Sequence, residues 1–163
     1  GSEMCIRDRY PSIPGWHTDG VPRGNELRPD VKKEPNIDAQ EERYGLRSPR
    51  YHLMVTGQHS LTDFITDQVE LEVPDEPRTT LYKMLDAQTK GLIASGAVTP
   101  FTAPSCTVVE FDWWNLHTAK AATGHEFRFL IRVTETDHLA PCQDLNKVIR
   151  TQQNVYVPEN YGW

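Results

Sequence analysis

The segment from Glu126 to Thr134 constrains the fold most, because it has the strongest strand character in the chain. Its apolar residues recur at every second position, so they share one face of an extended strand. These residues are Phe127, Phe129, Ile131 and Val133. Arg128 and Arg132 share the opposite face. A guanidinium buried on that face needs an anionic partner, whereas the alternative is an edge strand whose arginines lie in water.

Shorter β segments come earlier in the chain and are separated by turn residues. The pattern predicts strands at 51–56, at 60–66, at 107–111 and at 116–118, with a turn at 112–115. Residues 68–73 alternate strictly, which places Val69, Leu71 and Val73 on an inner face and the acidic residues outward. An edge strand is also predicted within the tail, at 154–157.

Residues 79–95 change to a helical period. The apolar positions that recur at this period are Leu81, Met84, Leu85, Leu92 and Ile93. Thr79 or Thr80 can cap the start of the helix, and Gly96 supplies a stop. Core packing is favoured over any cofactor role for this stripe.

These elements predict a mainly β fold with one helix between strands. About seven short strands separated by turns are typical of a sandwich or barrel. A jelly roll closes two small sheets over a cavity that can hold a metal and a ligand. A chain of 163 residues fits one such domain.

The two ends of the chain and one internal stretch stand apart from this pattern. Gly1-Ser2 is typical of a tag remnant, and residues 2–9 resemble the translated adapter that contaminates metagenomic gene models. We therefore expect a single domain over 10–163, with its native N-terminus shortened. Residues 20–50 are polar and of mixed charge, which is typical of a lid, a binding loop or a plain insertion. Packing of the 138–163 tail against a second copy would give a homo-oligomer.

Composition excludes several classes of partner. The formal charge is −6 and no basic stripe stands out, which argues against nucleic acid. No apolar run approaches the roughly 20 residues of a membrane helix. Three cysteines without regular spacing do not predict a disulfide framework, and no secretory signal is visible near the start. A reducing, cytoplasmic setting is the simpler expectation.

His17 and Asp19 are the first candidates for chemistry. On a strand, residues two apart point to the same face, so this imidazole and this carboxylate can reach one metal ion. Two histidines and one carboxylate form the facial triad of non-haem iron oxygenases, which leaves positions open for co-substrate and O₂. The alternative is a turn in which His17 only hydrogen-bonds a neighbour.

His117 follows a turn, and Arg128 and Arg132 come shortly after it. Arginine forms bidentate bonds to carboxylates, so a dicarboxylate ligand would supply the anionic partner that this strand face needs. In this order, Trp16-His17-Thr18-Asp19, His117 and the two arginines resemble the Fe(II)/2-oxoglutarate-dependent oxygenases, most closely the taurine dioxygenase and clavaminate synthase-like branch. The resemblance covers roughly residues 14–20 and 104–134.

The resemblance implies a double-stranded β-helix, a distorted jelly roll. It implies that His17, Asp19 and His117 ligate Fe(II), that Arg128 pairs with 2-oxoglutarate, and that Arg132 contacts the co-substrate or an anionic group of the substrate. The reaction would couple decarboxylation of 2-oxoglutarate to hydroxylation of a small molecule by O₂. Halogenating relatives lack the carboxylate, so Asp19 favours a hydroxylase. The gap between Asp19 and His117 is short for that branch, and little of the family's N-terminal region precedes His17.

Two other functions remain open at this point. One is a cupin-like metalloenzyme that does not use 2-oxoglutarate, and the other is a non-catalytic jelly-roll module that binds a ligand. In such a module the tryptophans would matter for ligand binding. Trp16, Trp113 and Trp114 could line the mouth of a pocket, although core or rim packing is expected for at least two of them. The remaining histidines are expected to be surface or hydrogen-bonded residues: His52, His59, His125 and His138.

Overall fold

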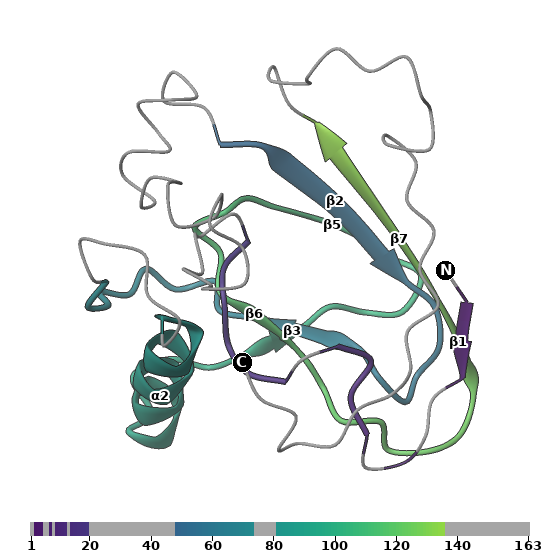
Figure 1. Ribbon diagram of the computed structural model, residues 1–163, viewed down its shortest axis with the longest axis horizontal. Coiled ribbons are helices and arrows are strands. Elements are labelled where there is room, and N and C mark those ends of the chain that lie inside the picture. Colours follow the sequence, from purple (N-terminus) through teal and green to yellow (C-terminus); the bar gives the residue numbers. More distant parts are fainter. Residues whose placement is uncertain are drawn as a thin grey trace, which may run out of the picture.

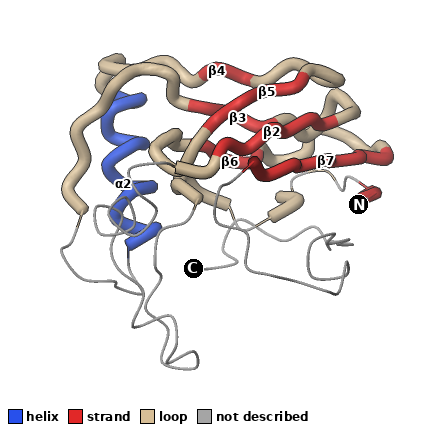
Figure 2. Tube along the Cα trace, turned by 90° about the horizontal axis from the view of Figure 1, so that it is seen from above, coloured by secondary structure: helices blue, strands red, loops and turns tan. Residues whose placement is uncertain are grey.

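Two antiparallel sheets and one helix make up the part of the chain that the computed structural model describes, which is residues 2–4, 7, 9–12, 14–19, 48–73 and 81–135 (Figure 1). The larger sheet contains, in spatial order, β1 (Ser2–Met4), β7 (Phe127–Glu135), β2 (Arg50–Val55) and β5 (Val108–Phe111). The smaller sheet contains β4 (Phe101–Thr102), β3 (Thr62–Phe64) and β6 (His117–Ala119). Helix α2 (Leu81–Ala94) lies at one end of the strands (Figure 2).

The mainly β fold class with one helix between strands is confirmed for these residues. Five predicted strands are present, with ends shifted by no more than two residues: β2, β3, β5, β6 and β7. Strand β4 was not predicted. Residues 20–47 and 136–163 lie outside the described residues, so the predicted 154–157 strand is not tested. Among the described residues, no helix combines the length and apolar character needed to cross a bilayer.

The core between the two sheets is built mainly from β2. Its alternate residues Tyr51, Leu53 and Val55 are buried and pack against Phe64 of β3 and Phe111 of β5. This is the period-two pattern expected of a strand with one buried face. The cluster joins the sheets close to β6, which pairs with β3 so that Phe64 lies opposite His117.

Strand β7 is oriented with its arginine face inward. Its register against β2 places Arg132 opposite Leu53 and Leu130 opposite Val55, so it shares the buried face of β2. Arg128 is only 3% exposed, and the alternative of a solvent-facing arginine row is therefore wrong at this position. The apolar side chains on the other face are exposed: Phe127, Phe129, Ile131 and Val133.

The strand predicted at 68–73 is wrong, because this segment has no strand partner among the described residues. It packs instead along the helical region, where Val69 and Leu71 contact buried clusters and Val73 remains 43% exposed. Gln88 of α2 replaces the missing strand neighbour. Its side chain accepts a hydrogen bond from the Glu72 amide at 2.8 Å and donates one to the Glu72 carbonyl at 3.1 Å.

Helix α2 matches the predicted helical segment and its role in the core. Leu81, Tyr82 and Leu85 are buried against Trp113. Gly96 ends the helix with a φ of +76°, a left-handed conformation that glycine adopts without a Cβ penalty. Thr79 and Thr80, the predicted caps, lie outside the described residues.

Residues near the start of the chain join the larger sheet. The β1 backbone pairs with β7 from Met4 opposite Phe127 to Ser2 opposite Phe129. Such pairing uses main-chain groups and so places little demand on side-chain identity. That residues 1–9 are foreign to the native protein, and that the domain spans 10–163, both remain predictions.

Candidate metal centre

The two candidate histidine ligands are joined directly through their backbones. His17 and His117 form an isolated antiparallel bridge, in which each amide donates to the other residue's carbonyl oxygen, at 3.1 and 2.9 Å. Their ring centroids lie 4.5 Å apart. Residues far apart in the sequence are therefore brought together by main-chain hydrogen bonds, which fix the relative positions of the two Cα atoms.

Both imidazoles are held in the same orientation by backbone carbonyls. Nδ1 of His17 lies 2.8 Å from the carbonyl oxygen of Gly15, and Nδ1 of His117 lies 3.0 Å from that of Asn115. A carbonyl can only accept, so each Nδ1 carries the hydrogen and each Nε2 keeps its lone pair. This is the arrangement in which a protein usually presents histidine to a metal.

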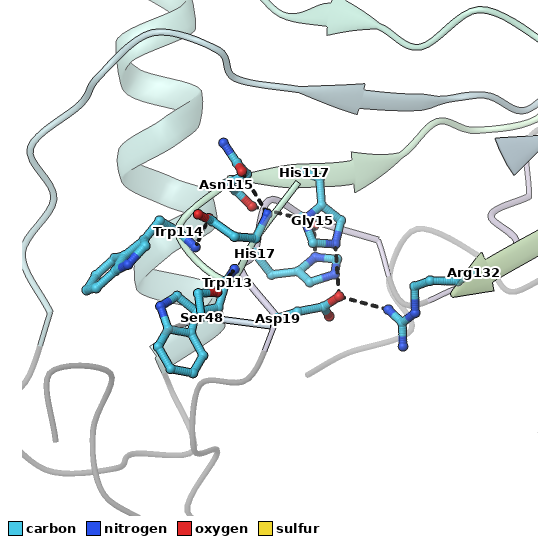
Figure 3. Close-up of polar contacts among 10 residues, drawn as sticks. Gly15, His17, Asp19, Ser48, Trp113, Trp114, Asn115, His117 and Arg132 are labelled. Carbon is cyan, nitrogen blue, oxygen red and sulfur yellow. Dashed lines mark hydrogen bonds and ion pairs between the residues drawn. The ribbon is translucent and has the colours of Figure 1, made fainter. Parts of the chain in front are cut away.

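Asp19 completes a set of three ligand groups (Figure 3). One potential ligand atom from each of His17, Asp19 and His117 lies within 4.8 Å of the other two. The Asp19 carboxylate Oδ2 is 4.0 Å from Nε2 of His117, close enough for both to contact one ion placed between them. The predicted convergence of these three residues is confirmed as a geometry able to hold a metal ion.

His117 is buried, and its surroundings favour the neutral imidazole. It is 7% exposed, and its ring contacts the rings of Phe64 and Phe111 at centroid distances of 5.7 and 4.9 Å. Burial lowers the pKa of His117 below its ordinary value, and this outweighs the opposing effect of the nearby Asp19 carboxylate. A neutral imidazole near neutral pH is the form that ligates a metal.

The two candidate arginines occupy different environments on one strand face. Arg128 is buried, and its Nε donates to the carbonyl oxygen of Ser60 at 2.9 Å. Arg132 has a side chain that is 47% exposed, and its Nη1 donates to Asp19 Oδ2 at 2.8 Å. Its guanidinium also lies 5.5 Å from the ring centroid of Tyr51. Arg132 thus contacts a candidate metal ligand, Asp19, and sequence reasoning did not assign this contact.

The tryptophans serve mainly as core residues. Trp16 is 6% exposed and packs with Ile65, Val98 and Leu116, and Trp113 is 1% exposed beside α2. Trp114 is 45% exposed and points away from the two imidazoles (Figure 3). Core packing for two of the three is therefore confirmed.

None of the other described histidines belongs to the triad. His52 lies on the outer face of β2 beside Glu110 and Glu135, and the ring of His59 is 3.0 Å from the Thr123 hydroxyl. His125 is exposed. His138 lies outside the described residues.

Two residues of α2 reach the first ligand segment and were missed by sequence reasoning. Asp86 accepts a hydrogen bond from the Trp16 amide at 2.9 Å, and the Tyr82 ring meets the His17 ring edge-on at a centroid distance of 5.7 Å. Their i,i+4 spacing places both on one helix face, but nothing in the sequence indicates what that face contacts.

The donor set fits a first-row divalent metal. Two imidazole nitrogens and one carboxylate oxygen form a ligand combination that Fe(II) accepts. The chain matches no protein-family model, no curated protein and no solved structure.

Proposed function

We propose that the protein is an Fe(II)- and 2-oxoglutarate-dependent dioxygenase that hydroxylates a small molecule. The observation that carries the proposal is the convergence of His17, Asp19 and His117, with Nδ1 of each imidazole held by a backbone carbonyl oxygen. In the balanced reaction, substrate C–H, 2-oxoglutarate and O₂ give substrate C–OH, succinate and CO₂. Bound iron would supply the redox chemistry, namely O₂ activation coupled to loss of CO₂ from the oxoacid.

Charge balance supports a dianionic co-substrate. Two neutral imidazoles and one carboxylate leave a divalent cation with one positive charge, and Arg132, which pairs with Asp19, adds a second. A doubly charged dicarboxylate would neutralise this charge, and the guanidinium of Arg128 would hold its second carboxylate. Arg128 is buried on the inward face of β7, where its charge is costly unless an anion or several acceptors surround it.

The surroundings of the centre support oxidation chemistry that is shielded from water. The rings of Phe64 and Phe111 cover one side of His117, and Tyr82 covers His17. Apolar walls of this kind exclude solvent and strengthen electrostatic contacts within the site. On this proposal the two antiparallel sheets are the halves of a double-stranded β-helix, with the metal centre at the end nearest α2.

Spectroscopy of the metal complex tests the proposal. Anaerobic addition of Fe(II) and then 2-oxoglutarate to the apoprotein should produce a weak visible charge-transfer band. The band should be lost in Asp19→Ala, because a ligand is removed, and weakened in Arg128→Ala, because a carboxylate partner is removed. His125→Ala, which deletes an exposed imidazole outside the triad, is the matched control and should leave the band intact.

The other outcomes separate the competing functions. Tight metal binding without a 2-oxoglutarate band, and turnover independent of 2-oxoglutarate, would identify a metalloenzyme of the cupin-like kind. Wild-type protein that binds no divalent metal would overturn the proposal and leave a ligand-binding module. Succinate formed in step with O₂ consumption would support the dioxygenase directly.

A further inference from the structure

Helix α2 contacts the first ligand segment through one of its faces. Tyr82 and Asp86 are one turn apart, and they contact the consecutive residues His17 and Trp16. The Tyr82 contact is to the ligand ring itself, at an interplanar angle of 88°. The Asp86 contact is to the amide of the residue that precedes the ligand. The helix therefore touches both the backbone and the side chain at this corner of the metal centre.

The Trp16 amide lies where the two ligand segments are fixed to each other. The next amide along the chain, that of His17, bonds to His117. The Trp16 side chain packs against Leu116, the residue that precedes His117. Asp86 supplies the acceptor for the partly buried Trp16 amide, and such an amide is costly to leave without one. Loss of that acceptor would favour a movement of Trp16, which the directly bonded His17 would follow.

The two carboxylate oxygens of Asp86 have separate partners. Oδ1 accepts from Trp16, whereas Oδ2 pairs with Nζ of Lys90 at 2.7 Å. The Lys90 side chain is 61% exposed, and its pair with Asp86 is an i,i+4 helix pair of the weak surface type. The role of Asp86 toward Trp16 therefore needs an acceptor oxygen and does not need the charge.

We propose that Asp86 is a positioning residue for the metal centre, which acts through the Trp16 amide to hold His17 at its ligating position. This inference rests on the proposed metal centre but does not require 2-oxoglutarate. It assigns a remote role in metal affinity to a helix whose sequence pattern indicates only core packing.

Co(II) titration of the apoprotein, followed by visible absorption, measures the effect. Asp86→Ala should weaken Co(II) binding about 10- to 100-fold, the usual range when a hydrogen-bond partner that orients a ligand is lost. Asp86→Asn retains an acceptor oxygen and should restore binding to near the wild-type value. Lys90→Ala removes the ion pair alone and should bind Co(II) like wild type.

Gln88→Ala is the matched structural control. Gln88 lies on the same helix and also holds a backbone amide of another segment, that of Glu72, but this segment carries no ligand. The Gln88→Ala variant should lose about as much thermal stability as Asp86→Ala, but its affinity for Co(II) should be unchanged. A merely structural role for Asp86 would make these two variants behave alike in both measurements, and would overturn the inference.

Hydrogen exchange covers the case in which Asp86→Ala does not fold. In the wild-type protein the Trp16 amide should be protected, and it should stay protected in Lys90→Ala and Asp86→Asn. Exchange of this amide at the rate of an exposed one in wild type would overturn the inference. Wild-type protein that binds no Co(II) would overturn the proposed function as well, whereas normal binding by a folded Asp86→Ala variant would overturn only the role of Asp86.

Discussion

His117 and the segment that carries His17 and Asp19 meet at one site, but different contacts hold them there. His117 belongs to β6, where strand pairing with β3 and the rings of Phe64 and Phe111 fix it. The 14–19 segment joins the smaller sheet through the bridge at His17 and reaches the core through the Trp16 side chain, and polar side chains hold it elsewhere. Asp86 binds the Trp16 amide and Arg132 binds the Asp19 carboxylate.

Because they are held by different contacts, the two halves of the centre should respond differently to mutation. The position of a residue within a paired, buried strand is determined by the core, so changes there alter both metal binding and stability. The position of a residue in a segment with one backbone bridge and few buried side chains can change while most of the core remains folded.

Replacement of either histidine should remove metal binding, but only one replacement should also weaken the fold. We expect His17→Ala and His117→Ala each to lower Co(II) affinity by more than the roughly 100-fold that loss of a ligand's hydrogen-bond partner can cost. His117→Ala should also lower the free energy of unfolding of the apoprotein by about 1–3 kcal/mol, because it empties a buried site. His17→Ala should lower it by less than about 1 kcal/mol. If chemical denaturation showed equal losses of unfolding free energy in the two variants, the proposed difference between the two halves of the centre would be wrong.

The pH dependence of apoprotein stability should report on the burial of His117. The unfolded chain protonates this residue near pH 6.5, whereas the folded protein protonates it only at lower pH because its pKa is lowered. Between these two values the unfolded state binds more protons, so the free energy of unfolding falls as pH drops below about 6.5, by up to about 1.4 kcal/mol per unit. Denaturant titrations of wild type and His117→Gln should show this slope only in wild type. Parallel curves for the two proteins would show that His117 is not the group responsible.

Removal of Arg132 should change metal affinity while stability changes little. Its positive charge lies 2.8 Å from Asp19 Oδ2 and opposes a second cation at the same carboxylate. Arg132→Gln should therefore bind Co(II) about 3- to 10-fold more tightly at low salt, with a smaller gain at high salt. The free energy of unfolding should change by no more than about 1 kcal/mol, as for exposed ion pairs. Weaker Co(II) binding by this variant would indicate instead that Arg132 mainly holds Asp19 in place.

A change on the outer face of β7 should have little effect on either metal affinity or the free energy of unfolding. Ile131 is 41% exposed and lies on the face of β7 opposite to Arg128 and Arg132. Ile131→Thr keeps a β-branched residue in the strand and should alter unfolding by about 0.5 kcal/mol or less, with no change in Co(II) affinity. A clear loss of metal binding would mean that the centre depends on the outer face of the larger sheet as well.

Sequence patterns were sufficient for most of the local structure in the described residues. Strand-forming residues bounded by turns located β2 and β5, hydrophobic alternation located β7, and the helical period with Gly96 located α2. Alternation failed at 68–73, because the side chain of Gln88 satisfies the backbone of Glu72 without a strand. A period of two describes an extended segment and does not specify which partner its backbone finds.

The candidate site was predictable to the level of its ligands and no further. His17, Asp19 and His117 were identifiable by residue type and order, and they do converge. The part played by Asp86 was not identifiable, since an Asp four residues before a Lys on a helix predicts only their mutual ion pair. The ion pair between Arg132 and Asp19 also depends on a strand register that local sequence does not encode.

Residue type and near neighbours were enough to indicate which side chains could ligate a metal and which segments would be extended or helical. The burial of Arg128 on β7 and the pairing of His17 with His117 depend on the assembled fold. Both outcomes result from pairing between segments far apart in the chain. The free energy of such pairing depends on burial and backbone hydrogen bonds across the whole fold.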